Sequence, residues 1–145
     1  MDHFDSWLQQ ATWNPETVVQ DEMKCEKDIS YLRNCYPKKA KEMVEVLCET
    51  CDQMEYENSS MLVPYPDKET IHLLVDRIYD SVKKKKENSI GRPTQGLFDN
   101  PQMSMEEMKE MMEKDILLIM LCDEMHRRRM RYCRRNQFFS TCENE

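Results

Sequence analysis

Residues 40–54 read AKEMVEVLCETCDQM, and this stretch decides the fold class. Its apolar side chains recur at intervals of three and four residues, and most of the positions between them are charged or polar. Because an α-helix turns once in 3.6 residues, this spacing places the apolar groups on one face of a helix. We expect a helix that buries this face, which consists of Ala40, Met43, Val44, Leu47, Cys51 and Met54.

The preceding segment predicts a second helix. Asn14 is a suitable N-cap, and Pro15 suits the first helical position because its missing N–H costs nothing there. Pro37 ends this helix and opens the one at 40–54. We expect its apolar face to meet the core through Val18, Cys25, Ile29, Leu32 and Tyr36.

A third helix follows a non-helical connection that contains Pro64 and Pro66. Asp67 precedes the helical pattern and is expected to cap it. The four lysines at 83–86 suit the C-terminal end, where positive charge complements the helix dipole. The apolar face of this helix is expected to comprise Ile71, Leu74, Val75, Ile78, Tyr79 and Val82.

The last helix begins at a capping box, in which Ser104 reaches forward and Glu107 reaches back. Helical character continues to about Gln137, a length of about 45 Å at 1.5 Å per residue. The sequence therefore predicts an all-α fold: a single small domain of about four helices, bundle-like, with a long loop before the last helix. Its expected parts are an N-terminal arm at 1–14 bearing Phe4, Trp7, Leu8 and Trp13, a three-helix core at 15–86, a loop at 87–103, a long helix at 104–137 and a tail at 138–145.

Glycine is scarce, and this limits the catalytic motifs that the chain can hold. The two glycines, Gly91 and Gly96, both lie in the predicted loop. Walker loops, dinucleotide-binding fingerprints and nucleophile elbows all need glycines at fixed offsets, because only glycine allows the backbone to turn so tightly or approach a phosphate so closely. We find no other coherent set of catalytic residues, and we expect a protein that is not an enzyme and needs no cofactor.

The cysteines and the N-terminus favour a cytoplasmic protein. Seven cysteines are an odd number, and residues 1–5 are acidic with no apolar run behind them that would indicate a secretory signal. The longest apolar run, 116–122, is far shorter than the roughly 20 residues that span a bilayer. We expect reduced thiols and no membrane association.

One pair of cysteines and one further pair of residues could supply a zinc site. Cys48 and Cys51 are three residues apart, and Cys122 and His126 are four apart, so each pair shares a helix face. Four such ligands would hold zinc if the two helices faced each other. The alternative is that the cysteines are small hydrophobic residues of the core, as buried free cysteines usually are.

Methionine is concentrated in the last helix. Eight of the 13 methionines lie between Met103 and Met130. Methionine-rich faces form adaptable binding surfaces, because the side chain is flexible and polarizable, although they also serve as ordinary core. A helix with methionine around most of its first turns indicates more than one neighbour, which favours a protein partner or a second copy of the chain.

The end of that helix is strongly basic in an otherwise acidic chain. The net charge is −7, yet residues 127–145 carry six arginines against two acids. Nucleic acid could be bound there, with aromatic groups available to stack on bases. The favoured interpretation is that the arginines neutralise the helix end and pair with acids of the first two helices. The residues proposed to contact a partner or nucleic acid are Arg127, Arg128, Arg131, Arg134 and Arg135.

The segments at 51–57 and 65–68, together with Tyr31-Leu32 and Tyr36-Pro37, also resemble known sequences. They are similar to a group of small uncharacterised bacterial proteins of spore-forming anaerobes, over about residues 28–80. The resemblance implies a bacterial origin and carries no catalytic residue across.

From the sequence we therefore expect a non-catalytic helical module that associates with itself or docks a protein partner through the last helix. A nucleic-acid-binding regulator that uses Arg127 to Arg135 is one alternative. A zinc or thiol site at Cys48, Cys51, Cys122 and His126 is the other.

Overall fold

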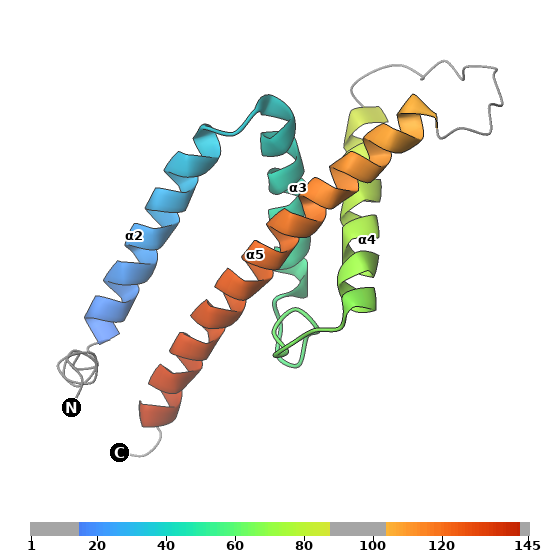
Figure 1. The fold of residues 1–145 in the computed structure, drawn as a ribbon. Coiled ribbons are helices and arrows are strands. Elements are labelled where there is room, and N and C mark those ends of the chain that lie inside the picture. Colours follow the sequence, from blue (N-terminus) through green and yellow to red (C-terminus); the bar gives the residue numbers. More distant parts are fainter. Residues whose placement is uncertain (1–14, 88–103, 143–145) are drawn as a thin grey trace, which may run out of the picture. The chain divides into compact units, whose positions relative to one another are not determined.

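The computed structural model describes residues 15–87 and 104–142, and every regular element in this part of the chain is α-helical. The prediction of an all-α protein of about four helices is confirmed. Figure 1 labels the helices α2 (Pro15–Asn34), α3 (Lys38–Met54), α4 (Lys68–Glu87) and α5 (Met105–Cys142). Several predicted parts lie outside the described residues. They are the arm at 1–14, which includes Asn14, the expected cap of α2, nearly all of the predicted loop, and residues 143–145.

The helix ends follow from local chemistry. Asp67 accepts a hydrogen bond from the Thr70 N–H at 2.8 Å, which confirms it as the cap of α4. At the start of α5, Glu107 N–H donates to Ser104 Oγ at 3.2 Å and Ser104 N–H donates to Glu107 Oε2 at 3.0 Å, so the capping box is also confirmed. α5 continues to Cys142, so residues 138–142 belong to the helix and not to a tail.

The chain divides into two compact units, and the boundary between them falls within α5. The first is the two-helix unit, whose described residues are 15–36 and 131–142. The second is the three-helix unit, whose described residues are 37–87 and 104–130. Each unit is described by itself.

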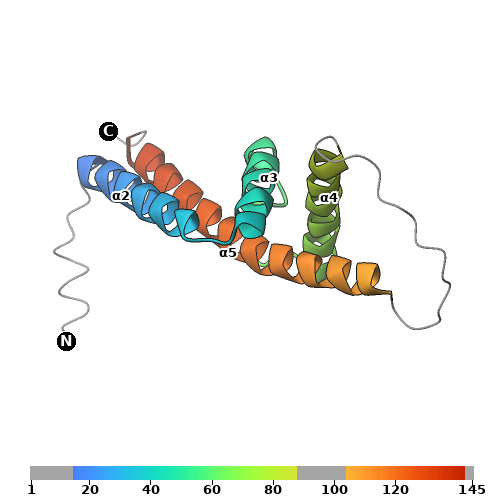
Figure 2. The same ribbon diagram turned by 90° about the horizontal axis from the view of Figure 1, so that it is seen from above.

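In the three-helix unit, α3 and α4 pack together and the first part of α5 lies across both. Figure 2 shows α3 and α4 nearly end-on, with α5 passing along the same side of each. Leu47 and Cys51 of α3, Ile78 of α4, and Leu117 and Leu121 of α5 are fully buried. The predicted faces of α3 and α4 therefore form much of this core, where each large aliphatic side chain contributes roughly 1.5–3 kcal/mol.

The connection between α3 and α4 is non-helical, as the prolines predict, and it contributes to the core. Met61 is buried, and its N–H donates to the hydroxyl of the buried Ser59 at 3.2 Å. Asn58 and Tyr65 have positive φ values of 63° and 54°, which turn the chain sharply. Asparagine tolerates this conformation better than tyrosine does.

In the two-helix unit, α2 runs antiparallel to the end of α5. Arg131 pairs with Glu26, and Arg135 pairs with Glu22, so the numbering rises on one helix as it falls on the other. The prediction that α2 buries an apolar face in a three-helix core at 15–86 is wrong. None of the side chains described in α2, at 16–34, is buried, because α2 packs only beside the end of α5 in its own unit.

Among the helices that the structure describes, none is long and apolar enough to cross a membrane.

Candidate functional site

The first half of α5 carries two apolar faces. Leu117, Leu121 and Met125 are buried against the three-helix core. A second row, at intervals of three and four residues, is exposed. Met112 and Leu117 differ by five positions, which is about 140° around a helix, so the two rows face different directions. We call the second row the exposed stripe; it consists of Met105, Met108, Met112, Ile116 and Ile119.

The exposed stripe borders a groove in the three-helix unit. The groove has a volume of about 650 Å³ and lies between the start of α3 and the first turns of α5. Met43 and Ala40 of α3 face Met112 and Ile116 of α5 across it. Isolated apolar residues on a surface are normal, but a contiguous apolar patch beside a groove is typical of a binding site.

A buried carboxylate lies at the edge of this groove. Glu113 of α5 is only 6% exposed, and it pairs with Lys39 of α3 and with Lys86 of α4, the latter at 3.7 Å. A carboxylate in this position needs such partners, because burying an unpaired charge is costly. The two lysines therefore tie all three helices together next to the exposed stripe.

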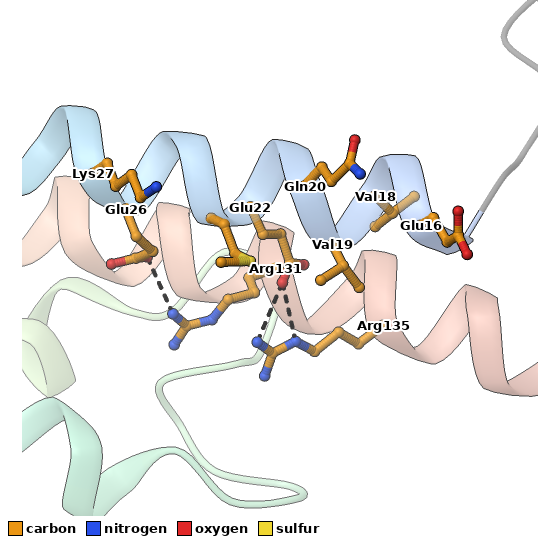
Figure 3. A pocket seen from close by; sticks show the side chains of 10 residues that line it. Glu16, Val18, Val19, Gln20, Glu22, Glu26, Lys27, Arg131 and Arg135 are labelled. Atoms are coloured by element: carbon orange, nitrogen blue, oxygen red, sulfur yellow. Dashed lines mark hydrogen bonds and ion pairs between the residues drawn. The ribbon is translucent and has the colours of Figure 1, made fainter.

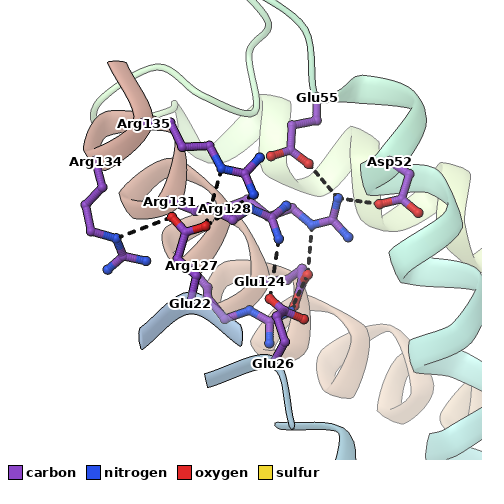
Figure 4. A network of polar contacts seen from close by, with 10 residues as sticks. All are labelled: Glu22, Glu26, Asp52, Glu55, Glu124, Arg127, Arg128, Arg131, Arg134 and Arg135. Carbon is purple, nitrogen blue, oxygen red and sulfur yellow. Dashed lines mark hydrogen bonds and ion pairs between the residues drawn. The ribbon is translucent and has the colours of Figure 1, made fainter. Parts of the chain in front are cut away.

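A second polar cluster surrounds Arg128 in the same unit. Figure 4 shows its guanidinium group between carboxylates of three residues. Nε donates to Glu124 at 2.8 Å, and one terminal nitrogen donates to Asp52 at 2.6 Å and to Glu55 at 2.9 Å. Arg128 and Glu124 are only 6% and 4% exposed. Arg128 therefore joins α5 to the end of α3.

The ionisation of this cluster is fixed by its hydrogen bonds. Burial alone would raise the pKa of Glu124, but hydrogen bonds from Arg128 and Arg127 hold this pKa below its usual range. Burial likewise opposes the charge of Arg128, but its hydrogen bonds to Glu124 and Asp52 raise the pKa of its guanidinium group. Both groups are charged at neutral pH. The cluster is therefore suited to holding α5 against α3 and not to transferring protons.

Of the remaining predicted arginines, Arg131, Arg134 and Arg135 pair with acids of α2, as the favoured interpretation expects, whereas Arg127 pairs within α5. In the three-helix unit, Arg127 pairs with Glu124 at 2.6 Å. In the two-helix unit, Figure 3 shows Arg131 and Arg135 directed toward carboxylates of α2: Arg131 lies 3.3 Å from Glu26, and Arg135 lies 3.2 Å from Glu22. Arg134 lies 3.9 Å from Glu22 as well.

The residues of the predicted zinc site differ in their surroundings. Cys51 is buried, Cys48 is half-buried, and Cys122 and His126 are exposed. Burial raises the pKa of the Cys51 thiol to about 12, which disfavours the thiolate that zinc requires. Within residues 15–87 and 104–142, no three His, Cys, Asp or Glu side chains are grouped so as to hold a metal ion. Cys51 behaves as a small hydrophobic core residue, whereas Cys122 does not.

Two functional features were missed from the sequence. The methionine concentration was recognised, but not its division into a buried and an exposed face; the spacing 105, 108, 112, 116 and 119 was the available signal. The partnership of Glu113 with Lys39 and Lys86 had no signal in the sequence, because it joins residues far apart in the chain.

No family model, curated protein or solved structure matches this chain. The resemblance noted over residues 28–80 therefore stays a prediction.

Proposed function

We propose that this chain is a non-catalytic interaction module that binds a helical segment of a protein at the exposed stripe of α5. The segment belongs either to a second copy of the chain or to a protein partner. The observation that carries this proposal is the second apolar face of α5, since a helix with two apolar faces has one that its own unit leaves uncovered.

The geometry supports a helix as the ligand. An amphipathic helix binds a groove through side chains at intervals of three and four residues, and the exposed stripe has the same periodicity. The flexible methionine side chains would adapt to the apolar face of the ligand. Lys39 and Glu106 at the groove supply charges of both signs that could orient it.

The arginines support this function better than nucleic-acid binding. Arg128 is buried among three carboxylates, and each of the other four predicted contact residues also lies beside a carboxylate of its own unit. Phosphate binding would have to compete with these ion pairs. We also propose a cytoplasmic setting, since the six cysteines whose surroundings are described are free thiols.

Sedimentation velocity of the full chain under reducing conditions tests the proposal. We expect dimers whose fraction rises with concentration, and we expect the double variant Met108→Glu/Met112→Glu to remain monomeric. Burying one methionine contributes roughly 1.5–3 kcal/mol, so even one such change should weaken association about tenfold or more. Leu73→Glu on α4 is the matched control, because Leu73 is also exposed and apolar.

If the unmodified chain is monomeric, selection from a displayed library of amphipathic helical peptides tests the partner version. Peptides that bind the unmodified chain and the Leu73→Glu control but not the double variant support the proposal. A chain that stays monomeric and selects no such peptide contradicts it, as does a dimer that the double variant leaves intact.

A further inference from the structure

Several apolar residues of α2 are exposed, while Val18 and Ile29 are half-buried. Val19 and Met23 are each 56% exposed, and Leu32 is 57% exposed. Most of the stability of a helix in a protein comes from packing an apolar face against a neighbour and not from intrinsic helix propensity. Within the two-helix unit, the end of α5 leaves much of that face open.

The open face includes an elongated groove. It has a volume of about 980 Å³ and is lined by apolar and charged residues of α2 and by two arginines of α5, as Figure 3 shows. Its α2 residues lie between Glu16 and Lys27, a length of about 17 Å at 1.5 Å per residue. The side chains that make it apolar are Val18, Val19 and Met23.

We propose that residues 1–14 of the same chain occupy this groove. This segment lies outside the described residues, and its sequence and its attachment favour it as the occupant. Phe4, Trp7, Leu8 and Ala11 follow the spacing i, i+3, i+4, i+7, which places them on one face of an amphipathic helix. As a helix, residues 1–11 span about 17 Å, which matches the groove, and residues 12–14 remain to reverse the chain direction before Pro15.

Attachment favours this segment over any free ligand. It joins α2 at Pro15, directly beside the end of the groove at Glu16. A ligand tethered by so short a connection has an effective concentration in the millimolar range or above. At such an effective concentration, a segment with only weak affinity for the groove is bound in most molecules.

The charges of the two parts are also complementary. Residues 1–14 contain Asp2 and Asp5 and no lysine or arginine. At the α5 side of the unit, Arg134 and Arg135 both approach the carboxylate of Glu22, so two guanidinium groups share one acidic partner there. Glu22 Oε1 is buried and, among the described residues, accepts no hydrogen bond. Indole and glutamine N–H groups in residues 1–14 are suitable donors.

Tryptophan fluorescence tests this proposal directly. Both tryptophans of the chain, Trp7 and Trp13, lie in the segment, so emission reports on it alone. The test uses Trp13→Phe, which leaves Trp7 as the one emitter. We expect its emission to be shifted to the blue relative to the protein in urea, with several-fold less quenching by acrylamide.

Changes in the groove should reverse this protection. Met23→Glu in the Trp13→Phe background should shift emission to the red and raise quenching toward the value in urea, and so should Phe4→Glu in the segment. Leu73→Glu, in the other unit and outside the exposed stripe, is the control and should change neither. Circular dichroism at each step confirms that the helices are retained, since Met23 is exposed enough for the substitution to be tolerated.

Three results would overturn the proposal. Trp7 could be as accessible in the native protein as in urea. It could be protected in a way that neither Met23→Glu nor Phe4→Glu affects. Or protection could disappear on dilution, which would show that the groove is filled by the segment of a second copy.

Discussion

At the scale of single residues, Arg128 shows how a charge is retained inside the three-helix unit. One guanidinium group meets carboxylates from Glu124, Asp52 and Glu55, and it is nearly inaccessible to solvent. Removing one partner of a buried ion pair leaves an uncompensated charge, and this typically costs about 3–5 kcal/mol. We expect Arg128→Met to lower the free energy of unfolding by about 3 kcal/mol, since Arg127 still pairs with Glu124.

Urea unfolding followed by circular dichroism measures this change. Arg129→Met is the control, because it removes an adjacent arginine outside the cluster. Equal effects of the two substitutions would mean that the Arg128 cluster adds no stability. The double variant Glu124→Leu/Arg128→Leu should be less destabilised than the sum of the single variants.

The lowered pKa of Glu124 makes stability depend on pH. The pKa of Glu124 is lower in the folded protein than in the unfolded chain, where it is about 4.3. The ion pairs of Glu124 therefore contribute fully to the free energy of unfolding at pH values above about 4.3. This contribution is lost as the pH falls through the folded pKa. We expect the free energy of unfolding to decline from about pH 5 downward, and to decline less steeply in Glu124→Gln. Urea titrations at a series of pH values measure both slopes. Identical slopes would contradict the assignment.

Cys51 should be the unreactive member of the cysteine pair. Its thiol is buried, and its pKa is raised to about 12, so little thiolate forms at pH 8. We expect iodoacetamide to modify Cys51 far more slowly than the exposed Cys35 in native protein, and at a similar rate in urea. Peptide mass spectrometry measures each site. Rapid native labelling of Cys51 would reopen the zinc or thiol hypothesis.

At the scale of elements, the capping box at the start of α5 positions the exposed stripe. Met105 and Met108 lie in the turn that Ser104 and Glu107 close. Loss of a serine cap typically costs about 0.5–2 kcal/mol, so Ser104→Ala should lower the free energy of unfolding by about 1 kcal/mol. Ser81→Ala is the control, because that hydroxyl bonds within α4 and caps nothing. Thermal unfolding that is equally unaffected by both changes would show that the cap is dispensable.

The existence of the helices and most of their ends were predictable because the causes are local, although α5 extends to Cys142, beyond the predicted end near Gln137. Pro37, Asp67 and the Ser104 and Glu107 pair act within four residues, and each marks the end that the sequence indicates. The burial of a face is not local. α2 has an apolar pattern like that of α3, yet none of its side chains described at 16–34 is buried, because burial depends on which elements pack against it.

At the scale of the molecule, charge was more informative than any motif. The concentration of acids in the first half of the chain and of arginines near its end predicted the pairing of Arg131, Arg134 and Arg135 with α2 and of Arg128 with Asp52. The candidate site was predicted only as a methionine-rich helix. The groove at this site is lined by Ala40 and Met43 of α3 together with Met112 of α5. Periodicity describes the faces of a single helix and cannot predict which residues of two helices lie close together.

The central claim, that the exposed stripe of α5 binds a helix, is tested most directly by NMR of methionine methyl groups. Met61 and Met125 are buried and serve as internal controls, whereas Met105, Met108 and Met112 belong to the exposed stripe. In a dilution series, or in a titration with a selected helical peptide, we predict shifts of the three stripe methyl signals and none of the two controls. Stripe signals that stay unchanged under both conditions would contradict the proposal.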